Sequence, residues 1–472
     1  MTTSEYLEAY HNMDTPLIDV VKVDPVIKTI RKIISEDKPL EPIQKILEEL
    51  SNVSFLLDIM IDSPIEDLEF ENIFKKLRAA ILSNLSTIKN STAALPFQVA
   101  LSLQCLHNDY LYDQTVMESE AVMWLENQIK NKLNYGDQPH LSELICFASY
   151  ERIHEYSWFN LLSIPLSIRG TELELFKRRH ITEPIEEKNL KGTIPSFKQI
   201  KNTVSCIVQG QYDQSPYPKW SNGNLIDPTY GLTFPNIDRP LILIAGCGTG
   251  RHSISISNLY EGCHIVAVDL SLNSLAYAKR KTEELNISNI DYLHADILDL
   301  RELGRKFDII ECTGVLHHME DPMAGWKVLT DCLKDEGFMQ VGLYSELARR
   351  DITKIRAEIE QSNIELTYQT MKQFRNQIIN SEEEHHKRIV SNPEFYNMST
   401  CRDMLFHVQE HRFTIPQIKE YLSQLGLTFR GFELNNLVAL DSLDEWDIFE
   451  QKNPNTFLNM YQFWAQKETK NI

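Results

Sequence analysis

Three closely spaced glycines and one acid that follows them are the residues whose spacing points most directly to chemistry. Gly246, Gly248 and Gly250 lie in the segment AGCGTG, and residues without a Cβ let the backbone turn tightly and lie against a ligand. Asp269 ends the next apolar run, where its carboxylate can accept two hydrogen bonds from a ribose diol. A dinucleotide site would require a glycine at the position of Arg251. The pattern therefore predicts a nucleoside-containing ligand that is not a dinucleotide.

The elements around these residues form a recognisable series. The apolar run 241–245 predicts a strand buried on both faces, the segment 251–260 a helix, and the run 265–268 a second strand. A strand, glycine turn, helix, strand and terminal acid form the nucleotide-binding half of a doubly wound sheet.

Further strands are predicted at 290–293, 307–311 and 338–343, and each is followed by residues that could serve a site. The carboxyl ends of parallel strands meet at one edge of a sheet, so these residues are expected to gather there. They are Asp296 and Ile297 after the third strand, Cys312, Thr313, Gly314, His317 and His318 after the fourth, and Tyr344 after the fifth.

The segments GCGTG, HADI and GVLHH, in this order with Asp269 between the first two, resemble motifs of class I S-adenosylmethionine-dependent methyltransferases. The resemblance implies a Rossmann-like seven-stranded sheet and S-adenosylmethionine as cofactor. One departure is Ala245, where many members carry an acid, so backbone carbonyls or a residue from elsewhere would hold the cofactor's amino group. The residues that the resemblance implies for cofactor binding are Tyr212, Ala245, Gly246, Cys247, Gly248, Gly250, Asp269, Leu270, Asp296, Ile297, Cys312, Thr313 and Gly314.

The candidates for the acceptor side are histidines and aromatic residues. A neutral histidine near the sulfonium could orient or deprotonate an acceptor, or it could pack beneath the cofactor without exchanging protons. The aromatic and proline-rich segment 211–224 is expected to be irregular, either a lid over the cofactor or a clasp between domains. Glu311 is interpreted as a strand-end carboxylate rather than a general base. The residues expected near the transferred methyl group are Tyr217, Trp220, His317, His318 and Tyr344.

The segments SPYPKW, GLYSELAR and CRDMLFHVQEHRF extend the resemblance to a bacterial family that includes protein lysine methyltransferases acting on rickettsial outer-membrane proteins. This similarity implies methylation of lysine amines on a protein substrate with accessible lysines, and a homodimer formed through an N-terminal helical domain. No residue identifies the acceptor. Two alternatives therefore stay open: a small-molecule O-, N- or C-methyltransferase, and a non-catalytic regulatory protein that binds S-adenosylmethionine.

The chain is expected to divide into five parts. They are a helical interaction or dimerisation domain (1–200), a linker or lid (201–240), the methyltransferase core (241–350), a helical insertion (351–412) and the completion of the sheet (413–472). In the first part, helical spacing of apolar residues predicts helices at 25–34, 43–57, 65–82, 94–111, 118–133 and 141–150. The segment 460–467 could be a closing antiparallel strand or a terminal helix.

The end of the insertion carries three residues at helical spacing. Asp403, His407 and His411 would share one face of a helix over 399–412. The spacing permits a metal site, but a polar wall of the acceptor pocket or an interdomain network is favoured, and no metal is predicted.

Composition narrows the class of partner and the compartment. A net charge of −20 argues against a nucleic-acid surface and tolerates a cationic substrate. The eight cysteines contain no C-x-x-C pair, which favours buried thiols in a reducing compartment. No apolar run has membrane-spanning length, and the first residues are polar and acidic, unlike a signal peptide. We therefore expect a cytoplasmic protein without membrane insertion.

Overall fold

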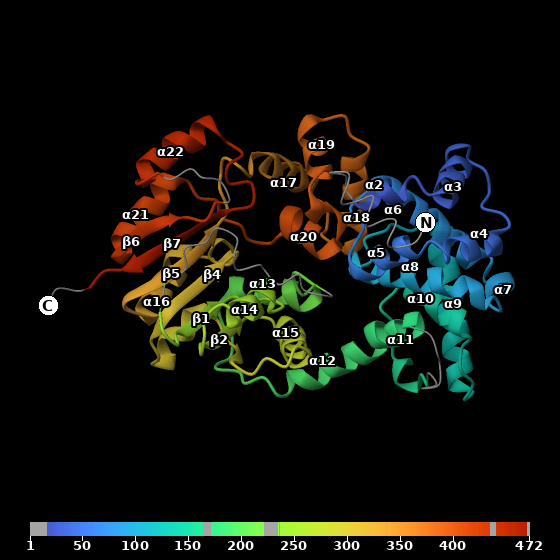
Figure 1. Cartoon of the computed structure of the whole chain (residues 1–472), viewed down its shortest axis with the longest axis horizontal. Coiled ribbons are helices and arrows are strands. Elements are labelled where there is room, and N and C mark those ends of the chain that lie inside the picture. The colour runs from blue at the N-terminus through green and yellow to red at the C-terminus, as the bar shows by residue number, and fades with distance from the viewer. Residues whose placement is uncertain (1–16, 164–170, 221–234, 236, 435–439, 470–472) are drawn as a thin grey trace.

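The structure is a computed structural model that describes residues 17–163, 171–220, 235, 237–434 and 440–469. Figure 1 shows two lobes, with a sheet and its covering helices in one and the N-terminal helices in the other.

The sheet lobe contains a seven-stranded sheet in the order β3-β2-β1-β4-β5-β7-β6. β7 runs antiparallel to both β5 and β6, and the other neighbouring pairs are parallel. The predicted Rossmann-like sheet is confirmed, and the segment near the C-terminus is a strand rather than a helix. The strands are β1 (Leu241–Ala245), β2 (His264–Asp269), β3 (Ile290–His294), β4 (Phe307–Thr313), β5 (Leu333–Leu343), β6 (Leu427–Phe432) and β7 (Tyr461–Lys467).

Both faces of the sheet are covered, which explains why β1 is apolar throughout. Leu243 and Ala245 belong to the core cluster on one face, and Ile242 and Ile244 belong to the cluster on the other. The helices of this lobe are α13 (Thr203–Gln214), α14 (Arg251–Ser257), α15 (Leu272–Glu284), α16 (Pro322–Cys332), α21 (Ile415–Leu425) and α22 (Leu443–Lys452).

The N-terminal lobe is helical, and one apolar cluster extends through it. Its helices are α2 (Leu17–Val21), α3 (Pro25–Ser35), α4 (Ile43–Leu50), α5 (Ser54–Asp62), α6 (Leu68–Ser83), α7 (Leu85–Ile88), α8 (Leu95–His107), α9 (Val116–Asn134), α10 (Leu141–Ala148) and α11 (Thr171–Lys177). The next helix, α12 (Glu183–Lys191), packs against α15 of the sheet lobe.

Two of the predicted N-terminal helices are wrong in extent. The helix expected over 43–57 is split into α4 and α5, because Ser51 Oγ and Asn52 Nδ2 donate to carbonyls of the preceding turn and end α4. The helix expected over 94–111 ends at His107, since Asp109 and Tyr110 adopt positive φ angles of 57° and 59°.

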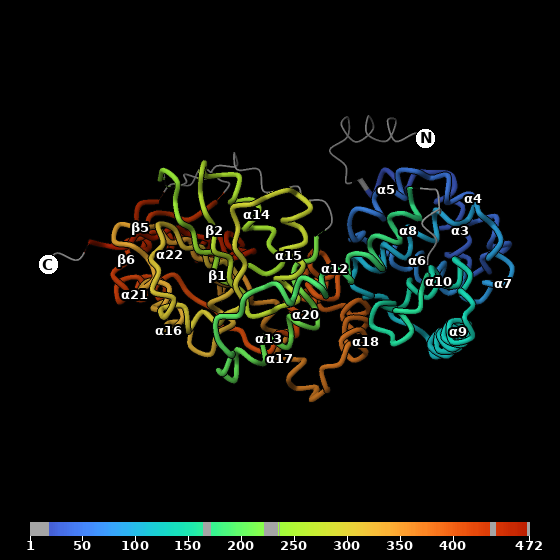
Figure 2. Tube along the Cα trace, turned by 90° about the horizontal axis from the view of Figure 1, so that it is seen from below, coloured from blue at the N-terminus to red at the C-terminus, as the bar shows by residue number. Residues whose placement is uncertain are grey.

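The segment after β5 forms α17 (Arg350–Ser362), α18 (Tyr368–Ile379), α19 (Glu384–Val390) and α20 (Met398–Phe406). Figures 1 and 2 show α18 and α20 between the sheet and the N-terminal helices. Its apolar cluster includes Leu111 of the N-terminal lobe. Arg375 of α18 donates two 2.8 Å hydrogen bonds to the Glu71 carboxylate of α6. This segment therefore connects the two lobes.

The predicted shared helical face of Asp403, His407 and His411 is wrong. α20 ends at Phe406, and His407 already has extended backbone angles. The Gln409 N–H donates to His407 Nδ1 at 3.1 Å, which stabilises the chain outside the helix. Within the described residues, none of the helices is long and apolar enough to cross a membrane.

Candidate functional site

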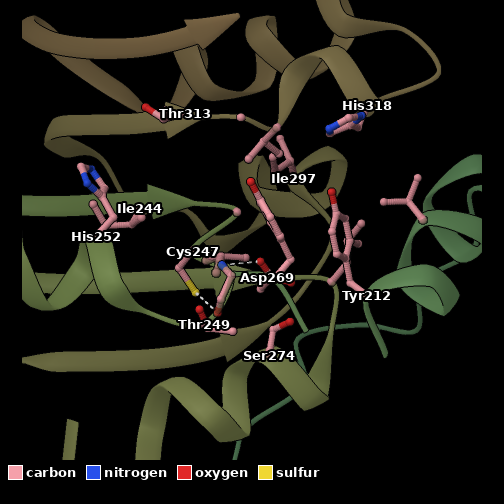
Figure 3. A pocket seen from close by; sticks show the side chains of 18 of the residues that line it. Tyr212, Ile244, Cys247, Thr249, His252, Asp269, Ser274, Ile297, Thr313 and His318 are labelled. Carbon is pink, nitrogen blue, oxygen red and sulfur yellow. Dashed lines mark hydrogen bonds between the residues drawn. The ribbon is translucent and has the colours of Figure 1, made fainter. Parts of the chain in front are cut away.

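A cavity of about 420 Å³ lies at the carboxyl ends of β1, β2 and β4, above the glycine turn that joins β1 to α14 (Figure 3). Gly246 has a φ of +80°, and a Cβ there would lie 2.3 Å from Val315 Cγ2. Gly248 has a φ of +53°, and a Cβ there would lie 2.8 Å from the Tyr217 carbonyl oxygen. Only glycine fits the backbone at these two positions, and the turn consequently exposes peptide groups to the cavity.

Two acids that follow β2 and β3 line the same cavity. Asp269 accepts hydrogen bonds from the backbone N–H groups of Gly248 and Ser271, both at 2.8 Å. Burial raises the pKa of Asp269 to about 6. Asp296 accepts from the Leu298 N–H at 3.0 Å, which holds its side chain at the start of the following turn. Both carboxylates are thus fixed by backbone donors.

The segment before the sheet covers the glycine turn. Thr249 Oγ1 donates to the Pro218 carbonyl, and Trp220 Nε1 donates to the Thr249 carbonyl at 3.2 Å. Tyr217 lines the first cavity, whereas Trp220 lines a second cavity between the lobes. The segment is therefore both a cover for the first cavity and part of the second.

The expected irregular stretch 211–224 needs one correction. Its first residues, including Tyr212, form the last turn of α13, a helix that starts at Thr203 with Asn202 as its N-cap. Residues 221–224 lie outside the described residues.

A carboxylate from α20 joins two tyrosines that line the cavity. Tyr212 donates to Asp403 Oδ1 at 2.7 Å, and Tyr344 donates to Asp403 Oδ2 at 3.4 Å. Burial and the neighbouring Asp403 raise the pKa of both tyrosines well above the ordinary value. Both phenols are therefore neutral and able to donate.

The hydrogen-bond partners assign the tautomers of two histidines here. His318 Nδ1 lies 2.7 Å from the Gln409 carbonyl oxygen and must carry a proton, which leaves Nε2 as a lone-pair acceptor. His318 lines the cavity, and Nε2 has no hydrogen-bond partner among the described residues. His407 Nδ1 accepts from the Gln409 N–H, so its Nε2 carries the proton and donates to the Tyr212 oxygen at 3.2 Å.

The ligand atoms of His318, Asp403 and His407 lie within 4.8 Å of one another, a spacing that a metal ion could use. A ring nitrogen that carries a proton cannot coordinate a cation, and the proton on His407 Nε2 is fixed by its other hydrogen bond. The arrangement instead forms a chain from His407 through Tyr212 to Asp403.

His317 lies behind this chain rather than in the cavity wall. It is fully buried, its ring stacks on Tyr344 at 3.9 Å between centroids, and neither ring nitrogen has a partner among the described residues. Burial, with adjacent His318, lowers its pKa well below the ordinary value. Its neutral ring positions Tyr344.

Most of the residues named from the sequence come together. Those that line the cavity are Tyr212, Tyr217, Gly246, Cys247, Gly248, Asp269, Leu270, Asp296, Ile297, Thr313, Gly314, His318 and Tyr344. The others are not in its wall: Ala245 and Cys312 lie in the apolar core, Gly250 packs near Ala278, His317 lies behind Tyr344, and Trp220 faces the second cavity.

Sequence reasoning did not anticipate the contact between His252 and Glu311, which also line the cavity. His252 is on α14 and Glu311 is on β4, so no local spacing connects them.

Residues 242–337 match a family model described as a methyltransferase domain. The chain carries a class I S-adenosylmethionine-dependent methyltransferase domain. The strand order and the glycine turn agree with this assignment, and the cofactor is S-adenosylmethionine. The cavity fits it: the glycine turn leaves room that a Cβ would fill, and Asp269 offers a fixed carboxylate for a ribose diol.

Several known proteins resemble this chain. An uncharacterized protein of Synechococcus sp. is 26% identical over 257 residues, covering 50% of this chain and 62% of the relative. The (S)-coclaurine N-methyltransferase of Papaver somniferum is 29% identical over 198 residues, covering 41% and 53%. Among solved structures, PKMT2 from Rickettsia typhi in complex with AdoHcy has a TM-score of 0.40 and 20% identity, covering 56% of this chain and 54% of that chain. The chain spans less than two thirds of the length of the first curated relatives it matches.

Proposed function

We propose that this protein transfers a methyl group from S-adenosylmethionine to an amine, most specifically the side-chain amine of a lysine on a protein substrate. The observation that carries the proposal is the position of Asp403, which contacts two tyrosine hydroxyls in the cavity beside the free Nε2 of His318. A buried carboxylate attracts an ammonium ion, and a neutral imidazole can accept its proton. The sequence resemblance to bacterial protein lysine methyltransferases supports the same acceptor.

The residues of this chain have distinct roles in the proposed reaction. When bound, the cofactor supplies an electrophilic methyl group on a sulfonium. Asp403 attracts the acceptor as an ammonium ion, and the hydroxyls of Tyr212 and Tyr344 fix the carboxylate orientation. Burial lowers the pKa of His318 and keeps the ring neutral, so the Nε2 lone pair is available for the proton that the amine releases. The amine lone pair is then free to attack the methyl carbon.

A second cavity offers a route to the site for a long acceptor side chain. It measures about 1390 Å³ and lies between the lobes, with Glu394 in its wall. Tyr217 donates to Glu394 Oε1 at 3.4 Å and also lines the cofactor cavity. The Tyr217 side chain thus lies between the two cavities, and a flexible lysine could reach the site from the larger one.

A small-molecule amine is a second candidate, favoured by the similarity to an N-methyltransferase of Papaver somniferum. The deciding experiment is transfer of radiolabelled methyl from S-adenosylmethionine to cell extract, separated into protein, nucleic acid and small-molecule fractions. Label on lysine side chains, identified by mass spectrometry, supports the first candidate. Label confined to small molecules supports the second. An absence of label from every fraction, with cofactor still bound, supports the regulatory alternative. Asp269→Ala is the blank.

The proposal includes a homodimer formed through the N-terminal lobe. α9 exposes Met117, Met123 and Trp124, with 81%, 60% and 64% of their surface accessible. Antiparallel contact between two α9 helices would bring Glu120 of each copy close to Lys130 of the other. Sedimentation should give a dimer for the unaltered protein and a monomer for Trp124→Lys, and a monomer for both would refute this part.

The eight unpaired cysteines are consistent with a cytoplasmic location.

A further inference from the structure

Glu311 is a buried acid in the cofactor cavity whose hydrogen bonds are incomplete. Its residue surface is 1% accessible, and it lines the cavity. One carboxylate oxygen, Oε2, contacts His252 Nε2. The other, Oε1, is buried without a hydrogen-bond partner among the described residues. A buried carboxylate oxygen without a donor is unfavourable unless a ligand supplies one.

The charges around Glu311 point to a cationic ligand group. Glu433 lies nearby and is already satisfied, since it accepts from Gln340 Nε2 at 2.9 Å and from Trp464 Nε1 at 2.5 Å. Burial disfavours the charged form of His252, but Glu311 and Glu433 raise its pKa overall. Two carboxylates therefore lie near the His252 ring, and Glu311 Oε1 has no donor among the described residues. A ligand ammonium group would supply one.

The position of Glu311 relative to the glycine turn identifies which cation fits. In the sheet register Glu311 is the partner of Ile244, two residues before Gly246. Figure 3 shows His252 beside Ile244 on one side of the cavity. The end of β1 is apolar at Ile244 and Ala245, so it offers no carboxylate side chain. The acid next to the start of the turn comes from the neighbouring strand.

We propose that Glu311 Oε1 binds the α-ammonium group of S-adenosylmethionine and that His252 holds the carboxylate in position. The ammonium is the one cationic group of this cofactor that has N–H donors, because the sulfonium has none. Asp269 at the end of β2 and Glu311 on β4 line the same cavity, so a ligand held at Asp269 through its ribose could reach Glu311 through its amino-acid part. The inference concerns the cofactor and does not depend on the identity of the acceptor.

The test compares two ligands that differ in the amino-acid part. S-adenosylhomocysteine carries the ammonium, and 5′-methylthioadenosine shares the adenosine and thioether but lacks it. Calorimetry should show that Glu311→Gln weakens the binding of S-adenosylhomocysteine by about 10- to 100-fold, as expected for a hydrogen bond to a charged group. Binding of 5′-methylthioadenosine should be unchanged. Asp269→Asn is the matched control and should weaken both ligands.

Equal weakening of both ligands by Glu311→Gln, or of neither, would overturn the proposal. A measurement on the unaltered protein keeps the test valid if the variant fails to fold. The deamino analogue of S-adenosylhomocysteine, which keeps the carboxylate, should bind about 10- to 100-fold more weakly than S-adenosylhomocysteine itself. Equal affinities would contradict the inference. Because no step requires methyl transfer, failure here leaves the proposed lysine methylation untouched.

Discussion

The rings of His318 and His407 stack with their centroids 3.6 Å apart, and they carry their protons on different nitrogens. Gln409 is responsible for both assignments: its carbonyl accepts from His318 Nδ1, and its N–H donates to His407 Nδ1. His318 therefore presents a lone pair to the cavity, whereas His407 donates toward Tyr212. Stacking also disfavours simultaneous protonation, since burial and His318 lower the pKa of His407 well below the ordinary value.

We predict that His318→Asn lowers kcat by about 100- to 10,000-fold, the contribution of a general base. The affinity for S-adenosylhomocysteine should change little, because His318 lies on the acceptor side. Burial lowers the pKa of His318, so in the unaltered enzyme kcat should decrease only below the ordinary histidine pKa of about 6.5. Steady-state kinetics and calorimetry on the same preparations check both statements. An unchanged kcat would exclude His318 as the base.

Cofactor affinity should depend on pH through Asp269. Its pKa is raised to about 6, so the carboxylate is ionised above that pH and protonated below it. Protonation removes one hydrogen-bond acceptor for a ribose diol, and S-adenosylhomocysteine should therefore bind more weakly at pH 5 than at pH 7. Asp269→Asn should weaken binding at pH 7 by about 10- to 100-fold and flatten this part of the pH profile.

The matched control for this experiment is Asp291→Asn on β3, whose side chain is 70% accessible. It should leave both the affinity and its pH dependence unchanged. A pH profile of Asp269→Asn identical to that of the unaltered protein would show that another group titrates.

Substitutions at two glycines can separate the cost of a strained backbone from the cost of steric overlap. Gly304 has a φ of +64° and open space at its Cβ position, so Gly304→Ala should reduce the free energy of unfolding by about 1–2 kcal/mol. At Gly246, an alanine would face the same unfavourable positive φ angle, and its Cβ would also overlap Val315. Gly246→Ala should cost about 1–3 kcal/mol more and abolish cofactor binding.

Adding Val315→Ala to Gly246→Ala removes the two Cγ atoms that a Cβ would meet. Urea denaturation should show that the double variant recovers the free energy of unfolding lost to steric overlap but not the part lost to backbone strain. A double variant no more stable than Gly246→Ala would refute the steric explanation.

The ion pair between Arg375 and Glu71 connects two distant segments, and its side chains are 3% and 6% accessible. Arg375→Met leaves the Glu71 carboxylate buried without its cation and should reduce the free energy of unfolding by about 3–5 kcal/mol. Replacing both residues, as Glu71→Leu with Arg375→Met, should recover much of that loss because no charge remains buried.

Denaturant unfolding and limited proteolysis of the 351–412 segment measure these effects. Arg388→Met is the control, since Arg388 pairs with Asp351 on the surface, and it should have little effect. A double variant as unstable as Arg375→Met would mean that the guanidinium acts through its other contact, the Phe395 carbonyl.

The sequence by itself determined the parts of this protein that depend on local spacing. β1 is apolar throughout because both sheet faces are covered, and the run 241–245 predicted this. Gly246 and Gly248 were recognisable from their spacing after the first apolar run, and both have positive φ angles in the turn. Asp269 and Asp296 could be placed because residues that follow parallel strands share one edge of the sheet.

The tertiary structure decided the contacts that join distant segments. Asp403 meets Tyr212 and Tyr344 only because α20 packs beside the cavity, and Glu311 meets His252 through the register of β4 on β1. The early end of α20 at Phe406 likewise lets one backbone group, Gln409, assign two histidine tautomers. Helical spacing could not predict these contacts, because each depends on how separate elements pack rather than on the period within one of them.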